Sequence, residues 1–212
     1  MKKTSIFSVV AGTWLALCDV AVAESMTEIV AADESAEWVI AIHGGAGSAT
    51  RADYSPDAEA AIRAVLRAAL EAGAALLEQG AAGTDAIVAA LTILEDSPRF
   101  NAGRGAALDE HGQARHDASI MRGQDLAAGA VAGSSRIRNP IAAAHAIMLN
   151  TNNVMLSGDG ADWFAANSGL EMAKPTYFVT DSRYQSLLKE RAKGEGPTAH
   201  IPSGDAVFGT VG

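Results

Sequence analysis

A glycine–threonine pair near the last residues, Gly209–Thr210, has the residue types needed to cut its own backbone. The threonine hydroxyl can attack the carbonyl carbon before it, move the chain from nitrogen to oxygen, and let water release a new amino terminus. Glycine tolerates the strained backbone that this step requires. The freed amine has a pKa of roughly 8, so it can act as the base for its own hydroxyl. Such pairs are common, so this interpretation needs support from other motifs.

A second motif is a glycine loop that follows a short apolar run. Residues 38–42 are apolar and lead into His43-Gly44-Gly45-Ala46-Gly47, which predicts a buried strand that enters a loop. The loop lacks G-x-G-x-x-G, and no Lys-Ser or Lys-Thr follows it, which argues against a phosphate site. Two interpretations stay open: a bare backbone that approaches a reacting group near Gly45, or a plain tight turn. His43 is more typical of a hydrogen-bonded structural histidine than of a metal ligand.

A third motif is an irregular loop, residues 95–105, that contains Asn101. Its amide offers both a donor and an acceptor to a reacting centre. A loop of this kind can turn several carbonyls toward one point, which would suit a hard cation such as sodium. The alternative is a well-packed connection without an ion.

Two further patterns favour structural roles, namely Asp117 as a structural aspartate and Gly158–Asp162 as the opening of a helix.

The first 23 residues predict an export signal. A basic start, Met1-Lys2-Lys3, precedes the mostly apolar segment 6–17 and the small-x-small site Ala21-Val22-Ala23. The apolar run is too short to span a bilayer, and no later run is long enough. Cleavage after Ala23 would remove the only cysteine, Cys18, and take the formal charge from −9 to −10. We therefore expect a periplasmic or secreted protein, and the acidity argues against nucleic acid or anionic lipid as a partner.

Helical and strand patterns alternate through the rest of the 212 residues, about half of which are hydrophobic. This favours a layered α+β domain over residues 38–193, after a flexible lead-in at 24–37. A linker rich in Gly, Pro and Ser follows at 194–206, and the cleavage site with its first downstream residues lies at 207–212. The expected helices run from Ser55-Pro56 to Gly80, from Thr84-Asp85 to 94, from Asn139-Pro140 to about Leu149, over 158–167, and from Thr180-Asp181 to Lys193. The expected strands are 38–42, the hairpin of 106–108 with 114–121, 127–133 and 154–156.

Taken together and in order, the motifs resemble those of the plant-type L-asparaginases, also called isoaspartyl peptidases. The resemblance runs from about Trp38 to Gly212, and several independent motifs in one order are far more specific than any one of them. The matching segments are His43–Gly47, Phe100–Ala106, Asp117–Met121, Ala128–Gly133, Arg138–Pro140 and Gly209–Gly212.

This resemblance implies the N-terminal-nucleophile hydrolase fold, an αββα sandwich that is incomplete here because its second half is missing. It implies a precursor cut at Gly209–Thr210 into α and β subunits, and a dimer of αβ pairs. Thr210 would be the nucleophile, Gly45 would place its backbone near the threonine amine, and Asn101 would support the nucleophile. No cofactor would take part in the chemistry. A structural sodium ion would be ringed by backbone carbonyls of Leu94, Glu95, Ser97, Phe100, Ala102 and Arg104.

The implied activity is hydrolysis of the side-chain amide of L-asparagine and of β-aspartyl dipeptides. The oxyanion donor and the cationic clamp for the substrate carboxylate would lie in the β subunit, so we expect residues 1–212 alone to be inactive. A close alternative is a glycosylasparaginase, which cleaves the sugar–asparagine link. Another is a noncatalytic periplasmic binding or assembly protein on the same scaffold.

Overall fold

The computed structural model describes residues 26–30, 37–44 and 51–193. The proposed signal (1–23), the linker (194–206) and the cleavage site (207–212) lie outside the described residues. The strands are β1 (Met26–Val30), β2 (Ile40–Gly44), β3 (His116–Met121), β4 (Ala128–Ser134) and β5 (Met155–Ser157). The helices are α1 (Pro56–Glu78), α2 (Gly83–Asp96), α3 (Pro140–Asn150), α4 (Gly158–Asn167) and α5 (Asp181–Ala192), with 3-10 turns η1 (Arg51–Asp53), η2 (Gly103–Gly105) and η3 (Pro175–Tyr177).

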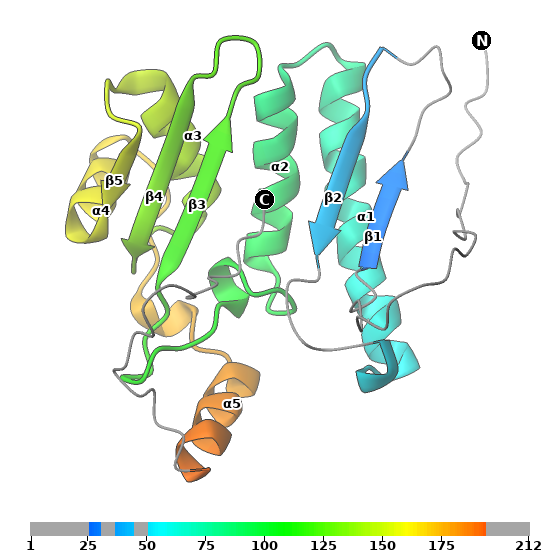
Figure 1. The fold of residues 1–212 in the computed structure, drawn as a ribbon, viewed down its shortest axis with the longest axis vertical. Coiled ribbons are helices and arrows are strands. Elements are labelled where there is room, and N and C mark those ends of the chain that lie inside the picture. Colours follow the sequence, from blue (N-terminus) through cyan, green and yellow to red (C-terminus); the bar gives the residue numbers. More distant parts are fainter. Residues whose placement is uncertain (1–25, 31–36, 45–50, 194–212) are drawn as a thin grey trace, which may run out of the picture.

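Strands and helices form two layers, with the helices behind the strands in the view of Figure 1. β1 and β2 make one antiparallel pair, and β3, β4 and β5 make a second sheet in that order. β4 pairs antiparallel with β3 and parallel with β5. Helix α1 packs on β2, and α3 packs on β3 and β4. The α+β class is as expected, but the described residues contain only one strand layer, so the two-sheet sandwich stays a prediction.

The ends of the helices follow the capping residues in the sequence. The Ser55 hydroxyl accepts a hydrogen bond from the amide of Ala58 at 3.2 Å and opens α1. Gly80 follows the other end of α1 with φ of +78°, a left-handed conformation that glycine adopts without a steric penalty. Thr180 caps α5 in the same way, because its hydroxyl accepts from the amide of Arg183 at 3.3 Å.

Three segments differ from the expectation. Part of the expected flexible lead-in, residues 26–30, is strand β1, which supplies partners for the backbone groups along one edge of β2. The expected hairpin partner at 106–108 is reduced to one bridge, Leu108 to Ala114. The helix expected from Thr84-Asp85 to 94 runs from Gly83 to Asp96 as α2, and its Ile87 is 40% exposed although Leu91 and Leu94 are buried.

The sheet buries one face and leaves the other open. Ile40 and Ile42 of β2 are buried against the helices, whereas the alternating Ala41 and His43 are exposed. β3 follows the same rule, with Ile120 buried and the neighbours on its other face exposed. The open face therefore has no covering layer among the described residues. None of the helices described is both long and apolar enough to cross a membrane.

Gly129 provides a test of the contact between β4 and α3. A Cβ built at Gly129 would overlap the carbonyl oxygen of Ala144 and the amide nitrogen of Met148, both backbone atoms that cannot move aside. Gly129→Ala should lower the free energy of unfolding by about 1–3 kcal/mol through overpacking, measured by urea denaturation. Gly123→Ala is the matched control, because a Cβ at Gly123 meets no atom within 4 Å. Equal stability of the two variants would contradict the close packing of β4 on α3.

Candidate functional site

Two motifs that are far apart in the sequence meet at the end of β2. Gly44 is buried, and a Cβ built on it would lie 2.8 Å from Cε1 of Phe100. Phe100 is itself buried and belongs to the core formed with α1 and α2. Gly44 directly precedes Gly45, and Phe100 directly precedes Asn101, so this contact brings the start of the glycine loop to the irregular loop. Gly45 itself lies outside the described residues.

Asn101 is oriented by its own loop. Its side-chain oxygen accepts a hydrogen bond from the amide of Ala107 at 2.8 Å. Because a backbone N–H can only donate, the atom that it meets must be the amide oxygen of Asn101, and the side-chain nitrogen stays available as a donor. Asn101 lines a cavity of about 180 Å³ between the end of α2, the start of α3 and β3, together with Glu95, Arg115, His116 and others.

The loop from Ser97 to Ala107 folds tightly onto itself. A Cβ at Gly103 would overlap the carbonyl of Glu95, and a Cβ at Gly105 would overlap the carbonyl of Phe100. Gly103 has φ of +49°, and both glycines are therefore required by close approach of the backbone. Of the six residues whose carbonyls were predicted to hold sodium, Leu94 and Glu95 end α2, and Ser97, Phe100, Ala102 and Arg104 lie in this loop. The carbonyls of Glu95 and Phe100 lie against the segment that contains Ala102 and Arg104, whereas those of Leu94 and Ala102 accept backbone hydrogen bonds from Ser97 (3.1 Å) and Gly105 (2.9 Å).

The side chain of Glu95 is buried at the start of α3. One carboxyl oxygen accepts a hydrogen bond from the amide of Ile141 at 2.9 Å, in the first turn of that helix. The other oxygen has no hydrogen-bond partner among the described residues. Burial raises the pKa of Glu95 to about 8, against the opposing effect of the hydrogen bond from the Ile141 amide. A protonated Glu95 therefore faces the cavity at neutral pH.

Asp96, the next residue, is the centre of a polar cluster. Its carboxylate accepts hydrogen bonds from Arg138 Nε at 3.2 Å, from the Asn139 side chain at 3.3 Å and from the Tyr177 hydroxyl at 3.2 Å. Arg138 also pairs with Glu171 at 2.5 Å, and these two carboxylates, Glu171 first, raise the pKa of Arg138. The cluster joins the end of α2, the start of α3 and the turn η3 at one point. From the sequence, Asn139-Pro140 was predicted only to start a helix, and no local pattern indicates the cluster.

His116 lines the cavity and is 3% exposed. Its ring packs on Phe178 with 4.2 Å between the ring centroids, and Nε2 has no hydrogen-bond partner among the described residues. Burial lowers the pKa of His116 to about 4, although Asp117 and Asp162 act in the opposite direction. His116 is therefore neutral at physiological pH. The strand places His116 and Ser119 on opposite faces, so these two side chains do not form a pair.

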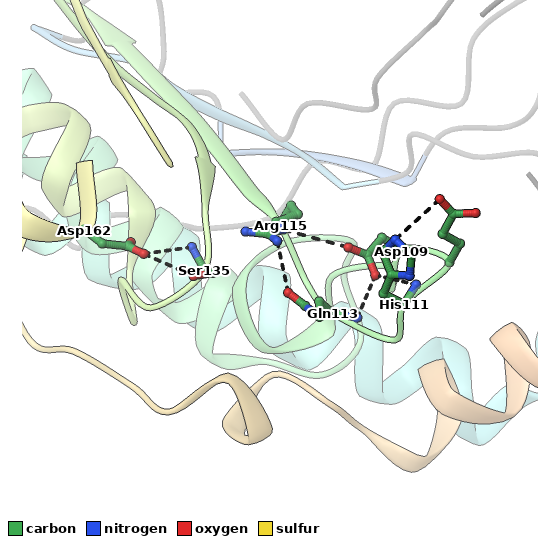
Figure 2. A network of polar contacts seen from close by, with 7 residues as sticks. Asp109, His111, Gln113, Arg115, Ser135 and Asp162 are labelled. Atoms are coloured by element: carbon green, nitrogen blue, oxygen red, sulfur yellow. Dashed lines mark hydrogen bonds and ion pairs between the residues drawn. The ribbon is translucent and has the colours of Figure 1, made fainter. Parts of the chain in front are cut away.

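The remaining polar residues near the cavity have structural partners. Arg115 hydrogen-bonds to Gln113 at 3.0 Å and pairs with Asp109 at 3.8 Å, and Figure 2 shows these groups together at the turn. Its guanidinium is thus engaged by the turn. Asp117 accepts from the amide of Gly133 at 2.7 Å, as expected for a structural aspartate.

The opening of α4 also has a structural role. Asp162 is buried and accepts hydrogen bonds from the hydroxyls of Ser134 (2.8 Å) and Ser135 (3.1 Å), and the second pair is drawn in Figure 2. The segment begins α4 at Gly158, so the prediction of a helix opening is confirmed. Gly209 and Thr210 lie outside the described residues, and their approach to Asn101 stays a prediction.

Comparison with known proteins gives a consistent set of relatives. A family model described as Asparaginase matches residues 36–212. An isoaspartyl peptidase of Escherichia coli (strain K12) is 42% identical over 179 residues, which cover 82% of this chain and 55% of that protein. An isoaspartyl peptidase of Salmonella typhimurium is 41% identical over 162 residues, 76% of this chain and 52% of that protein. A plant-type L-asparaginase of Pyrococcus abyssi is 40% identical over 156 residues, 74% of this chain and 50% of that protein. The chain spans about half the length of these relatives.

The buried imidazole predicts a loss of stability in acid. The unfolded chain binds a proton at His116 near pH 6.5 and the folded chain only near pH 4, so protons favour unfolding between these values. Each unit of difference between the folded and unfolded pKa changes the free energy of unfolding by about 1.36 kcal/mol. The wild type should therefore lose about 3 kcal/mol more stability in acid than His116→Leu, which lacks the imidazole.

The measurement is the difference in unfolding free energy between wild type and His116→Leu from pH 7 to pH 4. Because Glu95 is present in both proteins, its opposite pH dependence cancels from this difference. His111→Gln is the control, since His111 lies on an exposed turn and its side chain is 73% exposed. A difference that does not change with pH would contradict a neutral, buried His116.

Proposed function

This chain belongs to the asparaginase family, and on that premise we propose that the protein hydrolyses the side-chain amide of L-asparagine and β-aspartyl dipeptides. The names of the relatives, isoaspartyl peptidase and plant-type L-asparaginase, support both kinds of substrate. Both reactions break an amide bond at the same side-chain carbonyl of an aspartyl group. They differ only in the leaving nitrogen, which is ammonia in one case and an amino-acid amine in the other.

The observation that carries the proposal is the contact between Gly44 and Phe100. It joins the glycine loop to the loop that presents Asn101, although the two are more than 50 positions apart in the sequence. The Asn101 oxygen is engaged by the amide of Ala107, and no partner among the described residues engages the Asn101 nitrogen, which is therefore a fixed donor on the wall of a cavity. A fixed donor beside a cavity suits the support of a nucleophile or of a developing negative charge.

In the proposed mechanism, cleavage of the Gly209–Thr210 bond first frees the amine of Thr210. That amine accepts the proton of the Thr210 hydroxyl while the oxygen attacks the substrate amide carbon. The carbon–nitrogen bond then breaks, the proton moves to the leaving nitrogen, and an aspartyl ester of Thr210 remains. Water cleaves this ester, releases aspartate and restores the hydroxyl. Asn101 donates a hydrogen bond to the nucleophile, and the backbone near Gly45 accepts one from the amine.

We propose that the irregular loop and the end of α2 hold a structural sodium ion. The support is the tight fold of Ser97–Ala107, in which carbonyls approach Gly103 and Gly105 too closely for any Cβ. When bound, the ion would supply positive charge that fixes the loop, and no step of hydrolysis passes through it. The proposed ligands are the backbone carbonyls of Leu94, Glu95, Ser97, Phe100, Ala102 and Arg104.

The reaction also needs donors for the oxyanion and a cation for the substrate carboxylate. We propose that a β subunit, beginning at Thr210, supplies them and covers the open face of the sheet. Two observations support this: the chain spans about half of its relatives, and Arg115 at the cavity is engaged by Asp109 and Gln113. Residues 1–212 alone are accordingly proposed to be inactive, and the working form is a dimer of αβ pairs.

Export is part of the same proposal. The basic start, short apolar segment and small-x-small site of residues 1–23 support removal of a signal after Ala23. The reaction would then take place in the periplasm or outside the cell.

The test is turnover by the full-length gene product with and without the Thr210 hydroxyl. Wild type should release ammonia from L-asparagine and amino acids from β-aspartyl dipeptides, and Thr210→Ala should lower both rates by about 10⁴-fold or more, since nucleophile and base are lost together.

Purified residues 1–212 serve as the comparison and should show no turnover. An N-glycosylated asparagine, assayed in parallel, distinguishes the glycosylasparaginase alternative, which requires that substrate to be the fastest. Undiminished activity in Thr210→Ala would remove Thr210 from the mechanism.

A further inference from the structure

Two arginines of helix α5 donate hydrogen bonds to backbone carbonyls outside the helix. None of its residues is buried in the described structure, and in Figure 1 it projects from the end of the domain. The Arg183 guanidinium donates from Nε to the carbonyl of Gly105 at 2.5 Å, and Arg191 donates to the carbonyl of Glu110. The Gly105 oxygen belongs to the loop that carries Asn101, and the Glu110 oxygen belongs to the turn before β3.

The position of Arg183 is fixed by its neighbours. Phe178 is fully buried and packs against His116 and Tyr177, which anchors the chain three residues before α5 begins. Thr180 then caps the helix by accepting from the backbone amide of Arg183 itself. Arg183 stands in the first turn of this capped helix, close to the buried Phe178. Its backbone therefore has little freedom, and its contact with Gly105 is pre-organised.

Gly105 is linked to Asn101 by contacts within the loop. The amide of Gly105 donates to the carbonyl of Ala102 at 2.9 Å, and Gly105 packs so closely on Phe100 that no Cβ fits. Two residues later, the amide of Ala107 holds the Asn101 oxygen. A restraint on the Gly105 carbonyl therefore also restrains Ala102 and Ala107, the two ends of the turn that orients the Asn101 amide.

We propose that Arg183 is a positioning residue for Asn101, acting through the Gly105 carbonyl on the turn that presents the Asn101 amide to the reacting centre. The inference rests on the proposed function. Arg183 is partly buried, and burial lowers its pKa, so the guanidinium gives up hydration for this contact. Arg191 makes a similar bond, but on an exposed turn outside the Asn101 loop.

The experiment compares Arg183→Met with Arg191→Met in the full-length gene product. Arg183→Met should lower the rate constant of Gly209–Thr210 cleavage and kcat by about tenfold, because a small misplacement of a supporting group costs this much or more. KM should stay within about twofold and the melting temperature within about 2 °C of wild type, because neither the substrate site nor the core changes. Arg191→Met should match wild type in every measurement.

Arg183→Lys provides a graded comparison, since an ammonium can reach a carbonyl but lacks the fixed geometry of guanidinium. Its cleavage rate and kcat should lie between those of wild type and Arg183→Met. If Arg183→Met does not fold, Arg183→Gln replaces it in the same measurements. Wild-type kcat in a folded variant that lacks the guanidinium would overturn the proposal.

A double substitution separates positioning from general stability. If Arg183 acts through Asn101, adding Arg183→Met to Asn101→Ala should lower kcat by no more than about twofold beyond Asn101→Ala alone. A further tenfold loss in the double variant would mean that Arg183 acts elsewhere, and would overturn the assignment. If wild type neither cuts nor turns over substrate, the proposed function itself fails, and the inference falls with it. If wild type is active and Arg183→Met equals it, only the inference fails.

Discussion

Two neighbouring carboxyl groups at the end of α2 accept hydrogen bonds from the start of α3. The geometry of the site depends on these hydrogen bonds. Glu95 accepts from the amide of Ile141, and Asp96 accepts from Arg138 and Asn139. The loop that carries Asn101 leaves α2 directly after these residues. Since both helices are also buried in the core, their junction gives the loop a rigid origin, and the tight contacts of its glycines then determine its path.

The same region carries groups that reduce stability. Glu95 and His116 are each buried with an unpartnered polar atom, and burial shifts the pKa of each toward its neutral form. Their effects on stability oppose each other as pH changes: stability falls with rising pH through Glu95 and with falling pH through His116. Buried polar atoms that cost stability are common around reactive sites, where function and not packing selects the residue.

Local signals in the sequence predicted the local structure. The caps at Ser55 and Thr180 and the helix opening at Gly158 each act within a few residues, and each is found where expected. The contacts that orient the site are long-range and have no such signal. Asp96 and Arg138 are 42 positions apart, and Arg183 and Gly105 are 78 apart, so only the fold reveals these pairs. Strand β1 was not predicted from the sequence, because the strand is defined by its pairing with β2 and not by a periodic pattern of its own.

The central claim is that Thr210 becomes an amino-terminal nucleophile served by the Asn101 loop. Its most direct test is mass spectrometry of the purified full-length gene product after incubation at neutral pH, with labelling of free α-amines. The account predicts two chains, the second of which begins with an unmodified Thr210. A single uncut chain that nevertheless hydrolyses L-asparagine or β-aspartyl dipeptides would contradict it.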